Sequence, residues 1–283
     1  MTIDTKQYKK EVSRGYDNAA PGWYKWWKTI EMATQQVSKR LVELAEIKPG
    51  FNVLDIATGI GEPALTAAKQ VGKNGHILAI DISPQMLSFA KERANSLGLN
   101  EIVDFKEGDA ETIDLPSSTF DAALCRWGLM FLPNPEVGLS KIYESLVKGG
   151  HLAAAVWASP EKVPFISVPM NIVLKETNSP PPRTLGPFSM SDQNNLNKLH
   201  EESGFIDIAI ESVNVVSNFD SPDDFTTFTI DHGGPALQKV LAGETNERRQ
   251  QIEMAISKGS EMYADSTGKV RFENEAIIIV GRK

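Results

Sequence analysis

Apolar positions in the central part of the chain fall into short runs separated by amphipathic segments. The runs predict strands at Asn52–Thr58, His76–Asp81, Val103–Asp109, Phe120–Trp127 and Gly150–Trp157. The segments between them predict helices at Glu62–Val71, Ser83–Leu97 and Glu136–Val147. Strands that alternate with helices of about 10–15 residues pair in parallel through right-handed crossovers. Residues 50–158 therefore predict a parallel sheet covered by helices on both faces.

The flanking segments have other patterns. Residues 1–49 predict helices with a dense aromatic cluster, and residues 159–190 are rich in proline and predict a loop with one short helix. The remaining chain predicts a helix at Ser191–Ser203, a strand at Ile206–Val216, helices over 221–265 broken at DHGGP, and a strand at Glu275–Gly281. We expect residues 1–49 to form a helical lid on a domain of residues 50–283, with cap insertions at about 159–190 and 219–268.

Charge and composition narrow the class of substrate. The 283-residue chain carries 29 Lys and Arg against 37 Asp and Glu, a net charge of −8, and its basic residues are dispersed. Nucleic-acid binding needs a basic surface, so we expect a small-molecule substrate and no nucleic acid. The apolar runs are far shorter than the ~20 residues that span a bilayer, which predicts no stable membrane insertion. The polar N-terminus and the single cysteine, Cys125, favour a cytoplasmic protein.

The sequence LDIATGIGEP, at Leu54–Pro63, places two close glycines between the first strand and the first helix. Such a turn receives a nucleotide at the carboxyl end of the strand, and together with Asp81 it also fits a dinucleotide site. Charge favours a different cofactor, because Glu62 and Asp55 would repel a pyrophosphate at the helix N-terminus. A sulfonium, an ammonium group and two ribose hydroxyls suit an acidic rim. The turn therefore predicts S-adenosylmethionine as the cofactor.

Each acid of this rim has an expected place along the cofactor. Asp55 is expected to orient the turn near the methionine end, and Asp81 to accept hydrogen bonds from both ribose hydroxyls. Asp109 and the Ala110 amide are expected at the adenine edge, with Met86 against the adenine face.

Four segments of the chain resemble a known set of motifs. The segments VLDIATGIGEPAL, AIDISPQML, GDAETIDLPSSTFDAALCRWGLMFLPNP and LVKGGHLAAAVW, over residues 53–157, resemble the successive motifs of class I S-adenosylmethionine-dependent methyltransferases. The chain is most similar to the small-molecule group that includes the ubiquinone/menaquinone C-methyltransferases. The resemblance implies a Rossmann-like, seven-stranded, mostly parallel α/β sheet, with strands six and seven at one edge and the last strand antiparallel. Pro63 departs from the third position of the usual G-x-G-x-G turn, and the full quinone-enzyme signatures are absent, so the substrate of that group is not transferred.

The turn and the resemblance together give a set of cofactor-binding residues. Tyr16 resembles a tyrosine that precedes the core in related enzymes and lies near the methionine carboxylate. Arg126 ends the fourth strand and is expected to bind this carboxylate or an acidic acceptor, with a salt bridge to a nearby acid as the alternative. The full set is Tyr16, Asp55, Ala57, Thr58, Gly59, Gly61, Asp81, Ile82, Met86, Asp109, Ala110 and Arg126.

Aromatic residues are the candidates for the acceptor site. Trp23 and Trp27 fall on an apolar helical stripe and are expected to pack in a core. The candidates for contact with the acceptor are Tyr24, Trp26 and Trp127.

His232, in the sequence IDHGGP, is the candidate general base, because it is the only histidine expected in a loop within reach of the site. An ordinary histidine pKa of about 6.5 would suit this task. The alternative is that His232 caps the preceding helix near Phe225 and Phe228. Cys125 is expected to be a small buried hydrophobic residue, and no spacing of His, Cys and Asp predicts a metal site.

Methyl transfer from a sulfonium is a direct displacement that needs alignment and exclusion of water more than an acid or base. The sequence therefore predicts an enzyme that transfers a methyl group from S-adenosylmethionine to a small, apolar or aromatic acceptor, and it does not separate carbon, oxygen and nitrogen acceptors. One alternative is a nucleotide-binding oxidoreductase, which would bind NAD instead. The other is a non-catalytic methyltransferase-like subunit.

Overall fold

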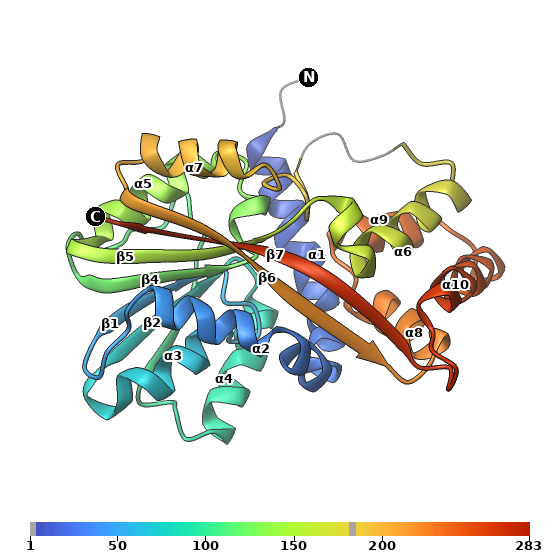
Figure 1. The fold of residues 1–283 in the computed structure, drawn as a ribbon, viewed down its shortest axis with the longest axis horizontal. Helices are drawn as coiled ribbons and strands as arrows, with labels where there is room; N and C mark the ends of the chain where they lie inside the picture. The colour runs from blue at the N-terminus through green and yellow to red at the C-terminus, as the bar shows by residue number, and fades with distance from the viewer. Residues whose placement is uncertain (1–3, 181–184) are drawn as a thin grey trace. The chain divides into compact units, whose positions relative to one another are not determined.

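The computed structural model describes residues 4–180 and 185–283, and within them seven strands form one sheet with helices around it (Figure 1). Residues 1–3 and 181–184, which belong to the expected lid and cap segments, lie outside the described residues. The strands are β1 (Asn52–Ile56), β2 (His76–Asp81), β3 (Val103–Glu107), β4 (Phe120–Arg126), β5 (Leu146–Trp157), β6 (Ile206–Phe219) and β7 (Val270–Arg282). The α-helices are α1 (Thr5–Lys25), α2 (Trp27–Leu44), α3 (Ala64–Val71), α4 (Pro84–Ser96), α5 (Pro135–Ser145), α6 (Pro164–Glu176), α7 (Gln193–Glu202), α8 (Pro222–His232), α9 (Pro235–Ala242) and α10 (Asn246–Ser260).

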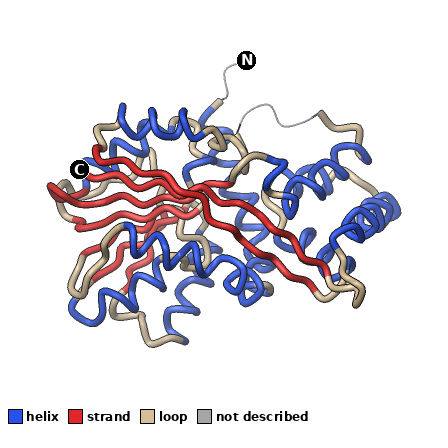
Figure 2. The backbone as a smooth tube through the Cα atoms, viewed as in Figure 1, coloured by secondary structure: helices blue, strands red, loops and turns tan. Residues whose placement is uncertain are grey.

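The strands follow the order β3-β2-β1-β4-β5-β7-β6 across the sheet, and Figure 2 shows the strands in red with helices around them. β1 pairs in parallel with both β2 and β4, and the parallel pairing continues to β3 and β5. β7 is antiparallel to β5, in a register that sets Ala154 opposite Ile279. This arrangement confirms the predicted Rossmann-like, mostly parallel sheet. The strand order reverses beside β1, so the carboxyl ends of β1 and β4 flank the position where open α/β sheets bind ligands.

The chain divides into two compact units. The sheet unit comprises Gln35–Ser159, Thr184–Val213 and Glu275–Lys283. The helical unit comprises Met1–Thr34, Pro160–Arg183 and Asn214–Asn274, and so draws on the segments expected as lid and caps. α2, β6 and β7 each contribute residues to both units. In the part of the chain that the structure describes, no helix is both long and apolar enough to cross a membrane.

The sheet unit follows the sequence pattern because its central strands are buried on both faces. In β5, every residue from Leu152 to Trp157 is buried. α4 begins as predicted, with Ser83 Oγ accepting the Met86 backbone N–H at 3.1 Å and Pro84 at the first helical position. β5 begins earlier than the predicted Gly150, because Leu146 already pairs with β4 ahead of a bulge.

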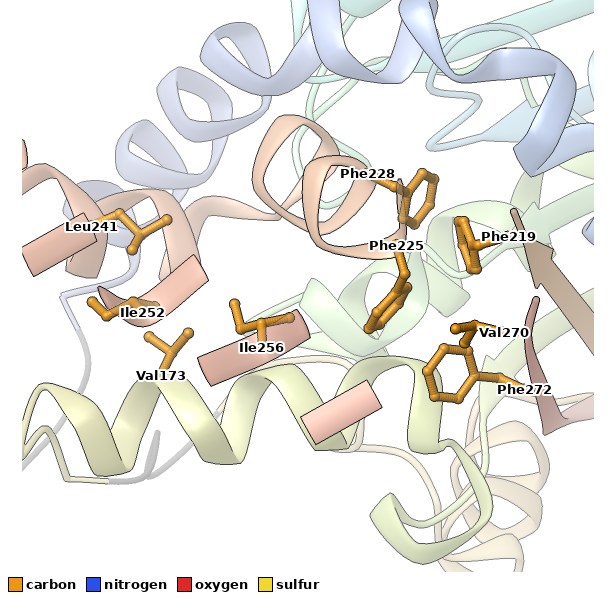
Figure 3. Close-up of a cluster of buried hydrophobic side chains, with 9 residues drawn as sticks. All are labelled: Val173, Phe219, Phe225, Phe228, Leu241, Ile252, Ile256, Val270 and Phe272. Atoms are coloured by element: carbon orange, nitrogen blue, oxygen red, sulfur yellow. The ribbon is translucent and has the colours of Figure 1, made fainter. Parts of the chain in front are cut away.

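The core of the helical unit is a cluster of aromatic and aliphatic side chains (Figure 3). Its buried members come from α6, β6, α8, α9, α10 and β7, and are Val173, Phe219, Phe225, Phe228, Leu241, Ile252, Ile256, Val270 and Phe272. The ring centre of Phe225 lies 4.6 Å from that of Phe272 and 5.1 Å from that of Phe219. Full burial of one such side chain stabilises a fold by about 1.5–3 kcal/mol. The cluster therefore gives this unit a hydrophobic core of its own.

The last two strands are longer than the apolar pattern predicts. β6 continues to Phe219 instead of ending at Val216, and β7 begins at Val270 instead of Glu275. The early part of β7 alternates exposed and buried residues, so the apolar run that marks a doubly buried strand is absent there. Asn274, which is buried, donates its side-chain amide to the Val215 carbonyl oxygen at 3.0 Å and links the two strands.

Candidate functional site

The glycine turn after β1 has a left-handed backbone at three alternate positions. φ is 58° at Ala57, 56° at Gly59 and 103° at Gly61. The predicted frame, with Pro63 as its third position, is therefore wrong, and Pro63 is instead the N-cap residue of α3 with a φ of −88°. A Cβ atom at Gly59 would meet nothing within 4 Å, whereas one at Gly61 would lie 2.9 Å from Leu65 Cδ1. Gly59 leaves space beside the backbone, and Gly61 allows α3 to pack closely.

Asp55, the residue before the last one of β1, is completely buried. Its Oδ2 accepts the backbone N–H of Ala64 at 2.9 Å and so ties β1 to the start of α3. Burial raises the pKa of Asp55 to about 7, although the charge of Arg126 acts in the opposite direction. The Thr58 hydroxyl also lowers the pKa of Asp55 as a side-chain hydrogen-bond donor, and Asp55 Oδ1 and Thr58 Oγ1 are both buried with no further partner within the described residues. Buried oxygens without a partner are uncommon in folded proteins and suit the donor of a ligand.

Asp81, the last residue of β2, contacts the glycine turn directly. Its Oδ2 accepts the Gly59 backbone N–H at 2.8 Å, and its Oδ1 accepts the Ser83 backbone N–H at 2.9 Å. Each carboxylate oxygen has a second lone pair, so the group can accept further hydrogen bonds. Ile82 and Met86 follow in the same loop and helix, and Met86 is buried. The structure brings these residues to the turn, while their contacts with a ribose and an adenine stay predictions.

Asp109 and Ala110 lie in the loop after β3. Asp109 accepts the Glu111 backbone N–H at 2.9 Å and the Thr112 hydroxyl at 3.1 Å. Glu111, which is buried, accepts both the backbone N–H and the side-chain amide of Asn134, at 2.7 and 3.0 Å. These bonds fix the loop after β3 against the loop that leads into α5.

Arg126 and Trp127 stand at the end of β4, the strand beside β1. Arg126 donates from Nη1 to Ser38 Oγ on α2 at 2.8 Å, and its guanidinium carbon lies 4.9 Å from the Trp127 ring centre. The Trp127 ring stacks on Trp157, with centres 4.4 Å apart and planes 12° apart. Trp127 Nε1 is buried and has no hydrogen-bond partner in the described part of the chain. The Arg126 guanidinium and the buried Trp127 Nε1–H therefore lie together at the carboxyl end of β4.

Glu62 is a buried, paired acid and not an open charge at the start of α3. Its Oε2 accepts the Thr66 hydroxyl at 2.7 Å, and its Oε1 lies 3.9 Å from Arg93 Nη2. Arg93, also buried, donates to the Ile60 carbonyl oxygen in the turn at 2.8 Å. Arg93 balances the charge of Glu62, so Glu62 does not present the open negative charge that was expected to repel a pyrophosphate, and only Asp55 of the two acids remains for that role. The acidic character of the site depends on the carboxylates at the strand ends.

Tyr16, Tyr24 and Trp26 belong to the helical unit, on α1 or at its C-cap. Trp26 Nε1 donates to Asp231 Oδ2 at 2.9 Å, and its ring meets the Phe228 ring edge-on with centres 5.5 Å apart. These contacts make Trp26 part of the packing of this unit. A contact of Tyr16 with a cofactor, and of Tyr24 or Trp26 with an acceptor, stays a prediction.

His232 is the last residue of α8 and does not lie in a loop as predicted. Its ring stacks on Phe228, with centres 4.2 Å apart, and lies 4.7 Å from the Trp23 ring centre. Burial lowers the pKa of His232 to about 4, so the expectation of an ordinary histidine pKa is wrong. Such a group is neutral at pH 7 and accepts protons poorly. The ring contacts favour a packing role beside Phe228, and the C-cap residue of α8 is Gly233, so His232 does not cap the helix as the alternative expected.

Other histidine and cysteine side chains serve packing. Cys125 is buried as expected, and burial raises the pKa of its thiol to about 12. His200, expected on a polar helix, is buried as well, with Nδ1 2.8 Å from the Leu196 carbonyl oxygen and a pKa lowered by burial to about 4. Over residues 4–180 and 185–283, no group of three or more His, Cys, Asp or Glu side chains is arranged to hold a metal ion.

From the sequence, no role is assigned to three residues that shape the site, namely Ser38, Arg93 and Trp157. Ser38 and Arg126 are 88 positions apart in the chain, and Arg93 is 33 positions from Ile60, so no local pattern joins them. Only Trp157 carries a signal, as a large aromatic residue at the end of an apolar strand next to β4.

Comparisons with known proteins agree with this geometry. The model of a family described as a methyltransferase domain matches residues 53–150. The demethylmenaquinone methyltransferase of Desulfitobacterium hafniense (strain Y51) is 32% identical over 122 residues, which are 43% of this chain and 48% of that protein. The aklanonic acid methyltransferase DauC of Streptomyces sp. (strain C5) is 33% identical over 151 residues, which are 53% of this chain and 67% of that protein. The chain thus spans about half to two thirds of the length of the curated relatives it matches.

Solved structures with low identity share the fold. The YcgJ protein from Bacillus subtilis has a TM-score of 0.59 at 18% identity, over 88% of this chain and 98% of that one. The [4+2]-cyclase SpnF has a TM-score of 0.61 at 18% identity, over 97% and 96%. At these identities the likeness shows the fold alone, and the cyclase name warns against taking a reaction from a fold. The sheet order, the turn after β1 and the similarity to DauC together show that the chain belongs to the class I S-adenosylmethionine-dependent methyltransferase family.

Proposed function

We propose that the protein transfers a methyl group from S-adenosylmethionine to a small, apolar or aromatic acceptor by direct displacement. The observation that carries this proposal is the set of groups at the carboxyl ends of β1 and β2. Asp55 Oδ1 and Thr58 Oγ1 are buried, and apart from the interaction between these two side chains they have no partner among the described residues. Gly59 leaves open space beside the turn, and Asp81 holds its N–H. Such acceptors fit a cofactor that brings an ammonium group, a sulfonium and hydroxyl donors.

The residues at the carboxyl ends of the strands fall into two groups, according to the part of the cofactor that each would bind. The adenosine side would comprise Asp81, Ile82, Met86, Asp109 and Ala110. The methionine side would comprise Asp55, Ala57, Thr58, Gly59, Gly61 and Arg126. When bound, the cofactor supplies a methyl group on a cationic sulfur that is already a good leaving group.

The chain's own contribution is binding, alignment and exclusion of water. Holding reactants in a fixed geometry removes much of the barrier to a displacement of this kind. A general base is needed only where the acceptor must lose a proton. Asp55 keeps or releases a proton near neutral pH, and a cation bound beside it favours the charged carboxylate.

The proposed acceptor class follows from charge and from aromatic residues. A net charge of −8 disfavours a polyanion, and Trp127 and Trp157 present a stacked aromatic pair at the ends of β4 and β5. The relatives are named for demethylmenaquinone and aklanonic acid, from which we carry over only that the acceptor is a small molecule. The proposal places the enzyme in the cytoplasm with no nucleic-acid partner, on composition alone.

Transfer of a labelled methyl group tests the proposal. The protein is incubated with methyl-labelled S-adenosylmethionine and a panel of phenols, quinols, carbon acids and amines, and products are identified by mass spectrometry. A methylated product formed in equal amount with S-adenosylhomocysteine supports the proposal. Cofactor binding without transfer to any member favours a non-catalytic methyltransferase-like subunit, and binding of NAD in its place favours an oxidoreductase.

A further inference from the structure

We infer that Gln35 on α2 and Thr66 on α3 are positioning residues that hold the glycine turn in the shape that binds the cofactor. They act through a relay of four contacts, which joins in order the residues Gln35, Thr66, Glu62, Arg93 and Ile60. The inference rests on the proposed function and deepens it, because it adds side chains outside the turn to those that determine cofactor affinity. Every residue of the relay belongs to the sheet unit.

The last contact of the relay fixes one peptide group of the turn. Arg93 Nη1 donates to the Ile60 carbonyl oxygen at 2.8 Å, and the Gly61 backbone N–H donates to the Thr58 carbonyl oxygen at 2.9 Å. Both polar groups of the peptide between Ile60 and Gly61 are therefore engaged. This peptide lies between Gly59 and Gly61, which both have a positive φ. Because glycine adopts many backbone conformations, Arg93 restricts the part of the turn where the sequence leaves most freedom.

Glu62 and Thr66 determine where the Arg93 guanidinium lies. Glu62 Oε1 is 3.9 Å from Arg93 Nη2, and both side chains are buried. Glu62 Oε2 accepts the Thr66 hydroxyl at 2.7 Å. A buried carboxylate needs hydrogen bonds as well as an opposite charge, so each of its oxygens depends on its own partner. Without the Thr66 hydroxyl, Glu62 Oε2 would lose this donor. Arg93 would then move toward the carboxylate and away from Ile60.

The order of donors and acceptors along the relay orients the Gln35 amide. A charged carboxylate can only accept, so the Thr66 hydroxyl proton is directed to Glu62. Thr66 Oγ1 then offers only a lone pair to Gln35, whose Nε2 donates to it at 2.8 Å. The amide oxygen of Gln35 is left as a buried acceptor with no partner among the described residues. Because an unpartnered buried oxygen costs stability, the net contribution of Gln35 to stability is small, and its effect is expected on cofactor affinity.

The relay holds the middle of the glycine turn, whereas the two acids of the strands hold its ends. Asp81 on β2 accepts the Gly59 backbone N–H, and Asp55 on β1 accepts the Ala64 backbone N–H. The relay reaches the turn from α2, α3 and α4 instead, and Gln35 is the first residue of α2 that belongs to the sheet unit. A change in the relay should therefore move the backbone beside the open space at Gly59 without removing any group that would contact the cofactor.

Calorimetry with S-adenosylhomocysteine, together with urea unfolding of each variant, tests the relay. Thr66→Val removes the hydroxyl at nearly the same shape and should weaken binding about fivefold to tenfold, whereas Thr66→Ser keeps the hydroxyl and should bind within about twofold of wild type. Gln35→Met should weaken binding about threefold and leave the free energy of unfolding unchanged, because it removes one hydrogen bond and one unpartnered buried oxygen. Lys39→Met, at an exposed position of α2, is the matched control and should change neither quantity.

A double variant separates a relay from two independent effects. If Gln35 acts through Thr66, the protein with both Gln35→Met and Thr66→Val should bind S-adenosylhomocysteine as Thr66→Val alone does. Independent effects would multiply and weaken binding by a further factor of about three, which would overturn the relay.

Two other results would overturn the relay while cofactor binding stands. One is wild-type affinity in folded Thr66→Val and Gln35→Met, and the other is an equal loss of affinity in Thr66→Ser and Thr66→Val. If Thr66→Val does not fold, wild-type affinity in Gln35→Met overturns the relay, and weaker binding at unchanged stability supports it. Wild-type protein that does not bind S-adenosylhomocysteine overturns the proposed function, and the role of the relay with it.

Discussion

Replacing Asp55 by asparagine should remove a pH-dependent cost to stability. Asp55 is completely buried, and burial raises its pKa from 3.8 to about 7. Between these two values the folded protein keeps a proton that the unfolded chain releases, so the free energy of unfolding falls as pH rises. The stability that the protonated Asp55 gives the folded protein, relative to the charged form, is fully present below about pH 4. It is lost once the pH passes about 7. Asparagine has nearly the same shape, can still accept the Ala64 N–H, and carries no charge.

The size of the effect follows from the shift. One pKa unit corresponds to about 1.4 kcal/mol, so a shift of about three units corresponds to roughly 4 kcal/mol above the folded pKa. In an experiment from pH 5 to pH 8, the free energy of unfolding changes through Asp55 only between pH 5 and about pH 7. This change amounts to about 3 kcal/mol. The change from aspartate to asparagine should therefore become more favourable by about 3 kcal/mol over this interval.

Urea unfolding at pH 5 and pH 8 measures this difference. The wild type, Asp55→Asn and the control Asp114→Asn are compared, and Asp114 is an exposed acid in the loop after β3. Taking differences between variants at each pH cancels the titration of all other groups. The stability of Asp55→Asn relative to wild type should rise by about 3 kcal/mol from pH 5 to pH 8, while that of the control stays constant. A relative stability that changes by less than about 0.5 kcal/mol would refute the argument from burial.

Three further predictions concern the turn and its surroundings. Arg93→Met should lower the free energy of unfolding by about 3–5 kcal/mol because it leaves the buried Glu62 without its balancing charge; urea titration should show most of this loss recovered by adding Glu62→Gln, and a loss below about 1 kcal/mol would contradict the pairing. Gly59→Ala and Gly98→Ala place a Cβ on backbones with positive φ and no atom within 4 Å, so each should cost about 1–2 kcal/mol of stability. Only Gly59→Ala should weaken S-adenosylhomocysteine in calorimetry, and equal affinities for the two variants would remove Gly59 from the site. His232→Gln should keep turnover of any acceptor found in the panel within about threefold, and a loss of about a hundredfold at unchanged cofactor affinity would restore the general base.

The parts of the fold that sequence predicts are those where one pattern dominates. The central parallel strands are largely buried, and β2, at His76–Asp81, begins and ends at the predicted residues. Ser83 and Pro84 place the start of α4 because capping is a local interaction. The early part of β7 is missed because its alternating residues do not form an apolar run. A strand or helix is therefore predicted well where it is uniformly buried or locally capped, and poorly where buried and exposed residues alternate.

The site is harder to predict because its geometry depends on distant partners and on backbone conformation. Ala57 takes a left-handed φ that its residue type does not indicate, and this shifts the frame of the turn away from Pro63. Glu62 looks like an open charge until Arg93, far along the chain, is brought beside it. His232 looks like a loop residue with an ordinary pKa until Phe228 and its neighbours bury it. Burial and pairing are properties of the folded chain, so residue type alone does not give them.

The central claim is that the edge of the sheet formed by β1, β2 and β4 binds S-adenosylmethionine. Titration calorimetry of the wild type with S-adenosylhomocysteine and with NAD, repeated on Asp81→Asn, tests it most directly. We predict that S-adenosylhomocysteine binds, that NAD does not, and that Asp81→Asn weakens S-adenosylhomocysteine by about tenfold or more through loss of a charge-assisted hydrogen bond. Asp114→Asn should bind as the wild type does. Binding of NAD without S-adenosylhomocysteine, or an unchanged affinity in a folded Asp81→Asn variant, would contradict the account.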